Sequence, residues 1–96
     1  MTDINARIAK AKGLPETRYD KHGFVEVYCE TPQYTTDWRL AGELLEEMKN
    51  NLDGIEYQES NKRWRIDFFL NYISRYVFGD TLPLAVALAY LDWSEK

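Results

Sequence analysis

The sequence predicts an α+β domain: a layered α/β/α sandwich in which about three helices cover a small antiparallel sheet of three or four strands. Apolar residues recur at helical spacing in residues 37–49 and 81–92, whereas apolar and polar residues alternate over residues 63–68. The turns between the strand-like segments are short, and short turns require antiparallel neighbours. Because 96 residues suffice for one domain, we expect residues 1–96 to form a single unit with its own core.

The first third of the chain is expected to contain one helix and one irregular segment. Residues 3–12 carry two isoleucines one turn apart, and Asp3 suits the N-cap position of a short helix. Residues 16–33 are the least regular part of the chain. Within them, residues 24–28 form either a strand or a packed loop, because their alternation is weak.

A second, amphipathic helix is predicted to begin at Asp37. The hydroxyl groups of Thr35 and Thr36 crowd its start together with the Asp37 carboxylate, and such groups satisfy the free N–H groups of a first turn. Apolar side chains recur at helical spacing along it: Trp38, Ala41, Leu44, Leu45 and Met48. Three acidic side chains lie off that stripe: Glu43, Glu46 and Glu47. We therefore expect this helix to cover a sheet.

Three strands and a last helix are predicted to follow. The strands lie at residues 55–58, 63–68 and 75–78. Alternation gives the middle strand one apolar face and one mixed face, formed respectively by Trp64, Ile66 and Phe68 and by Arg63, Arg65, Asp67 and Phe69. The last helix begins at Asp80 or Thr81. Pro83 is tolerated in its first turn, because the N–H that proline lacks would have no hydrogen-bond partner there. Its stripe consists of Leu84, Leu88 and Leu91, and its small alanines allow close approach to the sheet.

Composition excludes several classes of protein. With 12 Lys and Arg against 16 Asp and Glu, the net charge of −4 argues against a general nucleic-acid polymer binder. Cys29 is the one cysteine, so no internal disulfide forms, and one cysteine with one histidine makes no zinc finger. No apolar run approaches the roughly 20 residues of a membrane span, and the N-terminal stretch is polar, unlike a signal peptide. We expect no membrane association, metal or cofactor.

Two motifs resemble a known family. Pro32-Gln33-Tyr34-Thr35-Thr36-Asp37 opens the amphipathic helix, a strand centred on Trp64 follows, and Thr81-Leu82-Pro83-Leu84-Ala85 opens the last helix. Together they resemble small phage proteins of the phage ABA sandwich domain family, over about residues 30–92. That family typically shows Pro-x-Tyr-Ser-Thr-Asp and Thr-x-Pro-x-Ala at these places. The resemblance implies a phage or prophage protein that acts in the cytoplasm of the bacterial host, with an α/β/α fold and no known reaction.

An arginine-lined ligand site is the main functional candidate. Residues 61–79 carry four basic side chains against one acidic one. Arginine binds phosphate through two N–H groups and stacks on aromatic faces. The candidate ligand-binding residues are Arg63, Arg65, Arg75, Tyr76, Tyr34, Thr35 and Thr36. Each part of this site also has a structural alternative that needs no ligand. The arginines could form surface ion pairs with Glu43, Glu46 or Glu47 on a face of the sheet that a helix covers. The threonines could serve only to cap a helix.

Two functions follow from these candidates. The first is a non-enzymatic phage counter-defence protein that sequesters a small phosphorylated ligand such as a nucleotide immune signal. The alternative is a phage inhibitor that binds a host defence protein through its acidic helix and exposed aromatic side chains: Glu43, Glu46, Glu47 and Trp93. An enzyme is not expected, because His22 and Cys29 come with no orienting group or oxyanion motif. The surplus of aromatic residues predicts a homo-oligomer.

Overall fold

The computed structural model describes residues 3–95, which form three α-helices and five β-strands. In chain order the elements are α1 (Ile4–Ala11), β1 (Arg18–Tyr19), β2 (Val25–Val27), α2 (Trp38–Met48), β3 (Leu52–Gln58), β4 (Arg63–Leu70), β5 (Ile73–Gly79) and α3 (Leu82–Ser94). β1 and β2 pair as a hairpin, and β3, β4 and β5 form an antiparallel sheet in that order. The predicted α+β class, with three helices and a three-stranded antiparallel sheet, is confirmed.

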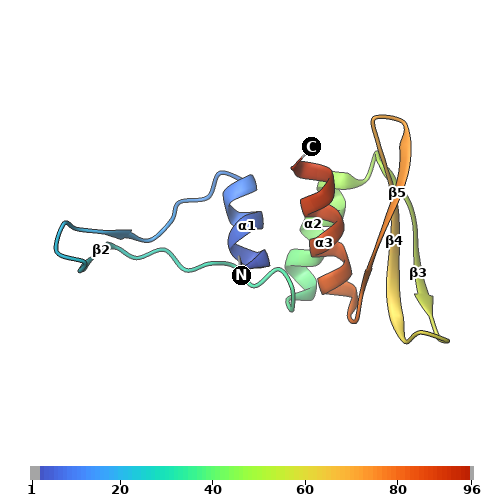
Figure 1. Cartoon of the computed structure of the whole chain (residues 1–96), viewed down its shortest axis with the longest axis horizontal. Coiled ribbons are helices and arrows are strands. Elements are labelled where there is room, and N and C mark those ends of the chain that lie inside the picture. Colours follow the sequence, from blue (N-terminus) through green and yellow to red (C-terminus); the bar gives the residue numbers. More distant parts are fainter. Residues whose placement is uncertain (1–2, 96) are drawn as a thin grey trace.

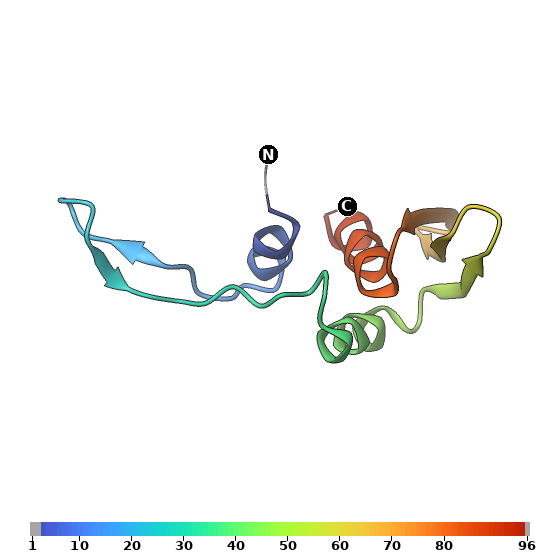
Figure 2. The ribbon, with the colours of Figure 1, turned by 90° about the horizontal axis from the view of Figure 1, so that it is seen from below.

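The three helices lie on one side of the three-stranded sheet (Figures 1 and 2). α3 contacts β4 and β5 directly, α2 packs beside α3, and α1 packs on α3. The layers therefore run from the β1–β2 hairpin through α1 and the α2–α3 pair to the sheet. No helix of residues 3–95 covers the opposite face of the sheet, so that face is open to solvent in the single chain.

Side-chain caps fix where the helices begin. Oxygens of Asp3, Asp37 and Thr81 each accept a hydrogen bond from a backbone N–H in the first turn of α1, α2 and α3 respectively. Pro83 lies in the first turn of α3, as predicted. All three helix starts were therefore readable from local sequence. Within residues 3–95, no helix has both the length and the apolar character needed to cross a membrane.

The core lies between the helices and the inner face of the sheet. Its fully buried side chains come from every helix and from β4: Ile8, Leu44, Met48, Ile66, Phe68 and Val86. Because α3 lies between α1, α2 and the sheet, it is buried around most of its circumference. The predicted leucine stripe is wrong for Leu84 and Leu88, which are only half-buried. The alanines of α3 are buried instead, and their small size lets α3 approach β5 closely.

Two segments differ from the sequence prediction. β3 begins at Leu52, three residues earlier than the predicted strand at residues 55–58, and its pairing with β4 has an irregularity between Leu52 and Gly54. In the irregular segment, the strand alternative is confirmed in a shortened form, Val25–Val27. Its partner Arg18–Tyr19 was not predicted, because two residues carry no detectable alternation.

Candidate functional site

The open face of the sheet carries two of the three arginines expected in the ligand site. Residues that pair across neighbouring antiparallel strands share a face, and Arg65 on β4 pairs with Phe78 on β5. Side chains alternate along each strand, so every second residue from this pair lies on the same face. We call this set the open face: Arg63, Arg65, Asp67 and Phe69 on β4, and Tyr76 and Phe78 on β5.

Arg63 is the cation of the open face that has no carboxylate partner among residues 3–95. Its Cζ lies 3.6 Å from the centroid of the Phe78 ring, a close cation–π contact. Its Nε lies 3.4 Å from Gln58 Oε1, a long hydrogen bond. Within residues 3–95, no carboxylate forms an ion pair with Arg63. Its guanidinium is therefore held in place by an aromatic ring while its charge remains unneutralised.

Arg65 has a different role on the same face. Its Nε and Nη2 lie 3.0 Å and 2.9 Å from Asp67 Oδ1, and the hydrogen bond to Asp67 raises the pKa of Arg65 further above its ordinary value. Its Cζ lies 4.3 Å from the centroid of the Tyr76 ring. Since Asp67 balances its charge, Arg65 chiefly holds Tyr76 in position. The Tyr76 ring stays 57% exposed and meets Phe78 edge-on, with 5.4 Å between the centroids.

Arg75 does not join the other two arginines. It pairs with Phe68 across β4 and β5, so it lies on the face that the helices cover. Its Nη2 donates to Oδ1 of Asp92 on α3 over 3.0 Å, and its Nε donates to the other carboxylate oxygen. This hydrogen bond raises the pKa of Arg75. Arg75 therefore joins the sheet to α3, and the expected convergence of three arginines is limited to Arg63 and Arg65.

The Tyr34–Thr36 segment also lies away from the open face. Tyr34 is 2% exposed and belongs to the core, where burial raises the pKa of its phenol. The backbone N–H of Thr35 donates to Asn5 Oδ1 over 3.0 Å, and that of Thr36 donates to the carbonyl oxygen of Gln33 over 3.2 Å. The segment is thus committed to the junction of α1 and α2, and the structure does not bring it together with Arg63.

The acidic side chains of α2 meet lysines and an arginine outside the sheet. Each has a cationic neighbour: Glu43 with Arg39 at 3.6 Å, Glu46 with Lys49 at 2.9 Å, and Glu47 with Lys12 at 2.5 Å. The alternative in which these acids pair with the sheet arginines is therefore wrong, because the helices do not cover the open face and Arg75 on the covered face pairs with Asp92. Trp93 is half-buried and packs against Tyr90, with 5.7 Å between the ring centroids.

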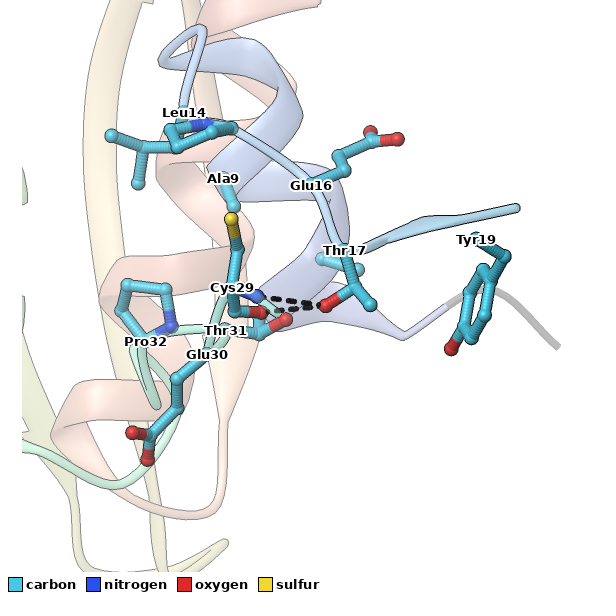
Figure 3. Close-up of a pocket in the computed structure, with 11 residues that line it drawn as sticks. Ala9, Leu14, Glu16, Thr17, Tyr19, Cys29, Glu30, Thr31 and Pro32 are labelled. Carbon is cyan, nitrogen blue, oxygen red and sulfur yellow. Dashed lines mark hydrogen bonds between the residues drawn. The ribbon is translucent and has the colours of Figure 1, made fainter. Parts of the chain in front are cut away.

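A separate hollow of about 620 Å³ lies at the base of the β1–β2 hairpin, against α1 (Figure 3). Its lining is mostly apolar and includes Ala9, Leu14 and Cys29. Thr17 Oγ1 accepts from the backbone N–H of Cys29 and donates to the carbonyl oxygen of Cys29, both over 3.0 Å. These bonds join the segment before β1 to the segment after β2. Within residues 3–95, no three His, Cys, Asp or Glu side chains gather as metal ligands.

Sequence reasoning missed two residues, one that supports Arg63 on the open face and one that holds the Tyr34–Thr36 segment away from it. Phe78 supports Arg63, and it could have been found, because alternation places it on the same face as Tyr76 once the strand is assigned. Asn5 anchors the Tyr34–Thr36 segment through its buried side chain, which also donates to Gln33 Oε1 over 3.2 Å. No local pattern pointed to Asn5, because both of its partners are distant in sequence.

Comparisons with known proteins show the fold and leave the family open. No protein-family model matches the chain, and no curated protein matches it. Among solved structures, the chain is similar to a phage protein from Bacillus cereus ATCC 14579, with a TM-score of 0.68 over 96% of this chain and 89% of that chain. Because the two sequences are 22% identical, the likeness establishes a shared fold alone. The resemblance to the phage ABA sandwich domain family stays a prediction. The likeness to a phage protein is consistent with it.

Proposed function

We propose that the protein is a non-catalytic phage accessory protein that binds a small phosphorylated ligand with an aromatic base, such as a nucleotide immune signal, on the open face of its sheet. The observation that carries this proposal is the pair formed by Arg63 and Phe78. The guanidinium lies 3.6 Å from the ring centroid and has no carboxylate partner within residues 3–95. A phosphate group would supply the missing counter-charge through paired N–H···O bonds.

The neighbouring aromatic rings suit the base of such a ligand. Tyr76 is more than half exposed, and Phe69 is exposed beside it on the same face. Exposed rings on an open sheet form a platform on which bases stack, and such stacking is worth about 1–3 kcal/mol per base. Arg63 and Tyr76 together therefore recognise both parts of a nucleotide, the phosphate and the base.

The charge of the whole molecule favours a small ligand over a polymer. Asp67 lies on the open face with the two arginines, and Glu56 on β3 lies beside it, paired with Arg65, so these four charges cancel. The full chain has a net charge of −4, and its field repels a long polyanion. A ligand with one or two phosphate groups contacts Arg63 without approaching the acidic surface of α2.

Sequestration in the cytoplasm of a bacterial host fits this site, because it requires affinity and no catalytic group. A protein that holds a host nucleotide signal in excess lowers the free signal concentration by mass action. The site offers a cation and exposed aromatic rings, which supply affinity for a phosphate and a base. A protein that only sequesters its ligand is expected to release it intact.

A thermal-melt panel tests the proposal. The panel contains cyclic di- and trinucleotides, ADP-ribose derivatives and mononucleotides, with the matching nucleosides and inorganic phosphate as controls. A ligand present at about 100 times its Kd adds about 2.7 kcal/mol to the free energy of unfolding, which is a rise of several degrees in Tm for a domain of this size. We expect a selective rise with one nucleotide class and none with its nucleoside or with phosphate. A flat panel would contradict the proposal and favour the alternative, an inhibitor that binds a host defence protein through the acidic helix α2 and exposed aromatic side chains.

A further inference from the structure

The hairpin arm, which we define as residues 16–30, projects away from the helices (Figures 1 and 2). It also exposes apolar side chains. Phe24 is 71% exposed and Tyr28 is 73% exposed, and Tyr19 and Val25 are also exposed. An exposed cluster of four large apolar side chains is typical of an interaction surface. A two-stranded hairpin on its own is at best marginally stable in water, so this arm lacks a core of its own. The arm thus has the composition of a segment that is buried against something.

The size of the molecule points the same way. The accessible surface is 6713 Å², whereas a compact monomer of 11.3 kDa exposes about 5,700 Å². The Cα radius of gyration is 15.3 Å, against about 12.5 Å for a compact domain of this length. The excess surface of about 1,000 Å² exceeds the roughly 800 Å² that each partner buries in a standard protein interface. The single chain therefore exposes enough additional surface for a stable dimer contact.

The base of the same arm offers a complementary surface. The hollow of about 620 Å³ there is lined by apolar atoms of Ala6, Ala9, Leu14, Pro15 and Cys29 (Figure 3). Glu16 and Glu30 also line this hollow and are exposed, and Lys21 lies in the turn at the tip of the arm. Within residues 3–95, none of these three charged side chains has an ion-pair partner.

We infer that the arm docks on a second copy of this chain, with the tip of each arm in the base hollow of the other. A two-fold axis across two antiparallel arms brings each tip to the partner's base, so one arrangement makes the same contact twice. Phe24 then enters the apolar hollow, and Lys21 faces Glu16 and Glu30. This dimer uses a surface distinct from the open face, so it stands independently of the proposed ligand.

Sedimentation velocity over a concentration series measures the dimer. The wild-type chain is expected to sediment as a dimer at tens of micromolar. Lys21→Glu places like charges together and raises the dimer dissociation constant by about tenfold or more. The triple variant Lys21→Glu, Glu16→Lys, Glu30→Lys restores opposite charges and returns the dissociation constant toward the wild-type value. Lys62→Glu, the same change in the β3–β4 turn, leaves the dimer unaffected.

A cysteine cross-link tests the geometry directly. Phe24→Cys at the tip faces Cys29 of the partner copy, so mild oxidation yields a covalent dimer on a non-reducing gel. Phe24→Cys with Cys29→Ser and Tyr72→Cys are matched controls, and neither is expected to yield it efficiently. Because Phe24 and Tyr72 are both exposed, we expect these variants to fold, and circular dichroism checks this expectation. A monomeric wild type would overturn the inference. So would a dimer whose dissociation constant the charge reversal leaves unchanged and in which Phe24→Cys forms no cross-link.

Discussion

Arg63 places its guanidinium carbon 3.6 Å from the centre of the Phe78 ring, diagonally across two neighbouring strands of the sheet. Arg65, two residues further along β4, donates instead to Asp67. The two arginines on this face of β4 therefore differ in whether a carboxylate balances their charge. Of the two, Arg63 has no carboxylate partner within residues 3–95. Under the proposed function, this difference makes Arg63 the anion contact, while Arg65 positions Tyr76.

The first prediction separates Arg75 from the ligand site. Arg75→Ala removes the ion pair with Asp92 that joins β5 to α3, so we expect a small decrease in Tm. The affinity for the ligand found by the melt panel should stay within about twofold of wild type, because Arg75 lies on the opposite face. Isothermal titration calorimetry measures this affinity. Loss of binding in Arg75→Ala would show that the ligand sits on the helix-covered side of the sheet.

The second prediction concerns the close approach of α3 to β5. A Cβ atom on Gly79 would lie 2.5 Å from the backbone N of Ala85 and 2.7 Å from its Cα. Backbone atoms cannot move aside as a flexible side chain can, so Gly79→Ala should lower the free energy of unfolding by about 1–3 kcal/mol. Urea denaturation measures this change.

Gly42 provides the matched control for Gly79. It lies on the exposed side of α2, and a Cβ atom there meets nothing within 4 Å. Gly42→Ala should therefore stabilise the protein by about 0.5–1 kcal/mol, because alanine favours a helix interior. Equal effects of the two substitutions would contradict the packing of α3 on β5.

The third prediction concerns Asn5, the buried polar side chain of α1. Its Oδ1 accepts from the backbone N–H of Thr35 over 3.0 Å, and its Nδ2 donates to Gln33 over 3.2 Å. Asn5→Ala leaves these groups without partners, which should cost about 1–3 kcal/mol of the free energy of unfolding. Asn50→Ala, at an exposed position after α2, should change it by less than about 0.5 kcal/mol. Similar values for both variants would remove Asn5 as the link between α1 and the segment before α2.

The fourth prediction is a loss of stability in alkali. Burial raises the pKa of the Tyr34 and Tyr90 phenols above their ordinary value of 10.0. For Lys12, burial lowers the pKa, but the hydrogen bond to Glu47 and the charge of that carboxylate outweigh it and leave the pKa above 10.5. All three groups have a higher pKa in the folded state than in the unfolded state. Their contribution to stability is therefore complete below about pH 10 and is lost as the pH rises through the folded values.

The Tm measured from about pH 8 to about pH 12 tests this dependence. The double variant Tyr34→Phe, Tyr90→Phe cannot ionise at these positions, so its Tm should fall less steeply above about pH 10 than that of the wild type. Tyr72→Phe, at a fully exposed turn position, serves as the control and should leave the wild-type slope unchanged. A double variant with the wild-type slope would show that these two phenols do not limit alkaline stability.

The helix starts and the sheet order were predictable because their causes are local. Asp3, Asp37 and Thr81 cap the helices that follow them, and short turns allow only antiparallel neighbours. The hairpin arm was not predictable, because its strands have two and three residues and too little alternation to detect. The arrangement of all three helices on one side also depends on long-range packing, of which the sequence carries no direct sign.

The face on which Arg75 lies depends on a single turn. Asn71 and Tyr72 have φ values of 52° and 67°, as in the two-residue hairpin turns that match strand twist. This turn pairs Leu70 with Ile73, and the same register then places Arg75 opposite Phe68. A turn longer by one residue would reverse every side chain of β5. The placement of Arg63 and Arg65 on one face of the candidate site could therefore be predicted, whereas the position of Arg75 required the register.

The most direct test of the central claim is a calorimetric titration of Arg63→Ala with the nucleotide that the melt panel identifies. We expect a loss of about 1.5–3 kcal/mol in binding free energy, the range for a hydrogen-bonded charged group, with the melting temperature of the free protein nearly unchanged. Arg39→Ala, an equally cationic but exposed position on α2, should bind as the wild type does. Wild-type affinity in Arg63→Ala would contradict the assignment of the open face as the ligand site.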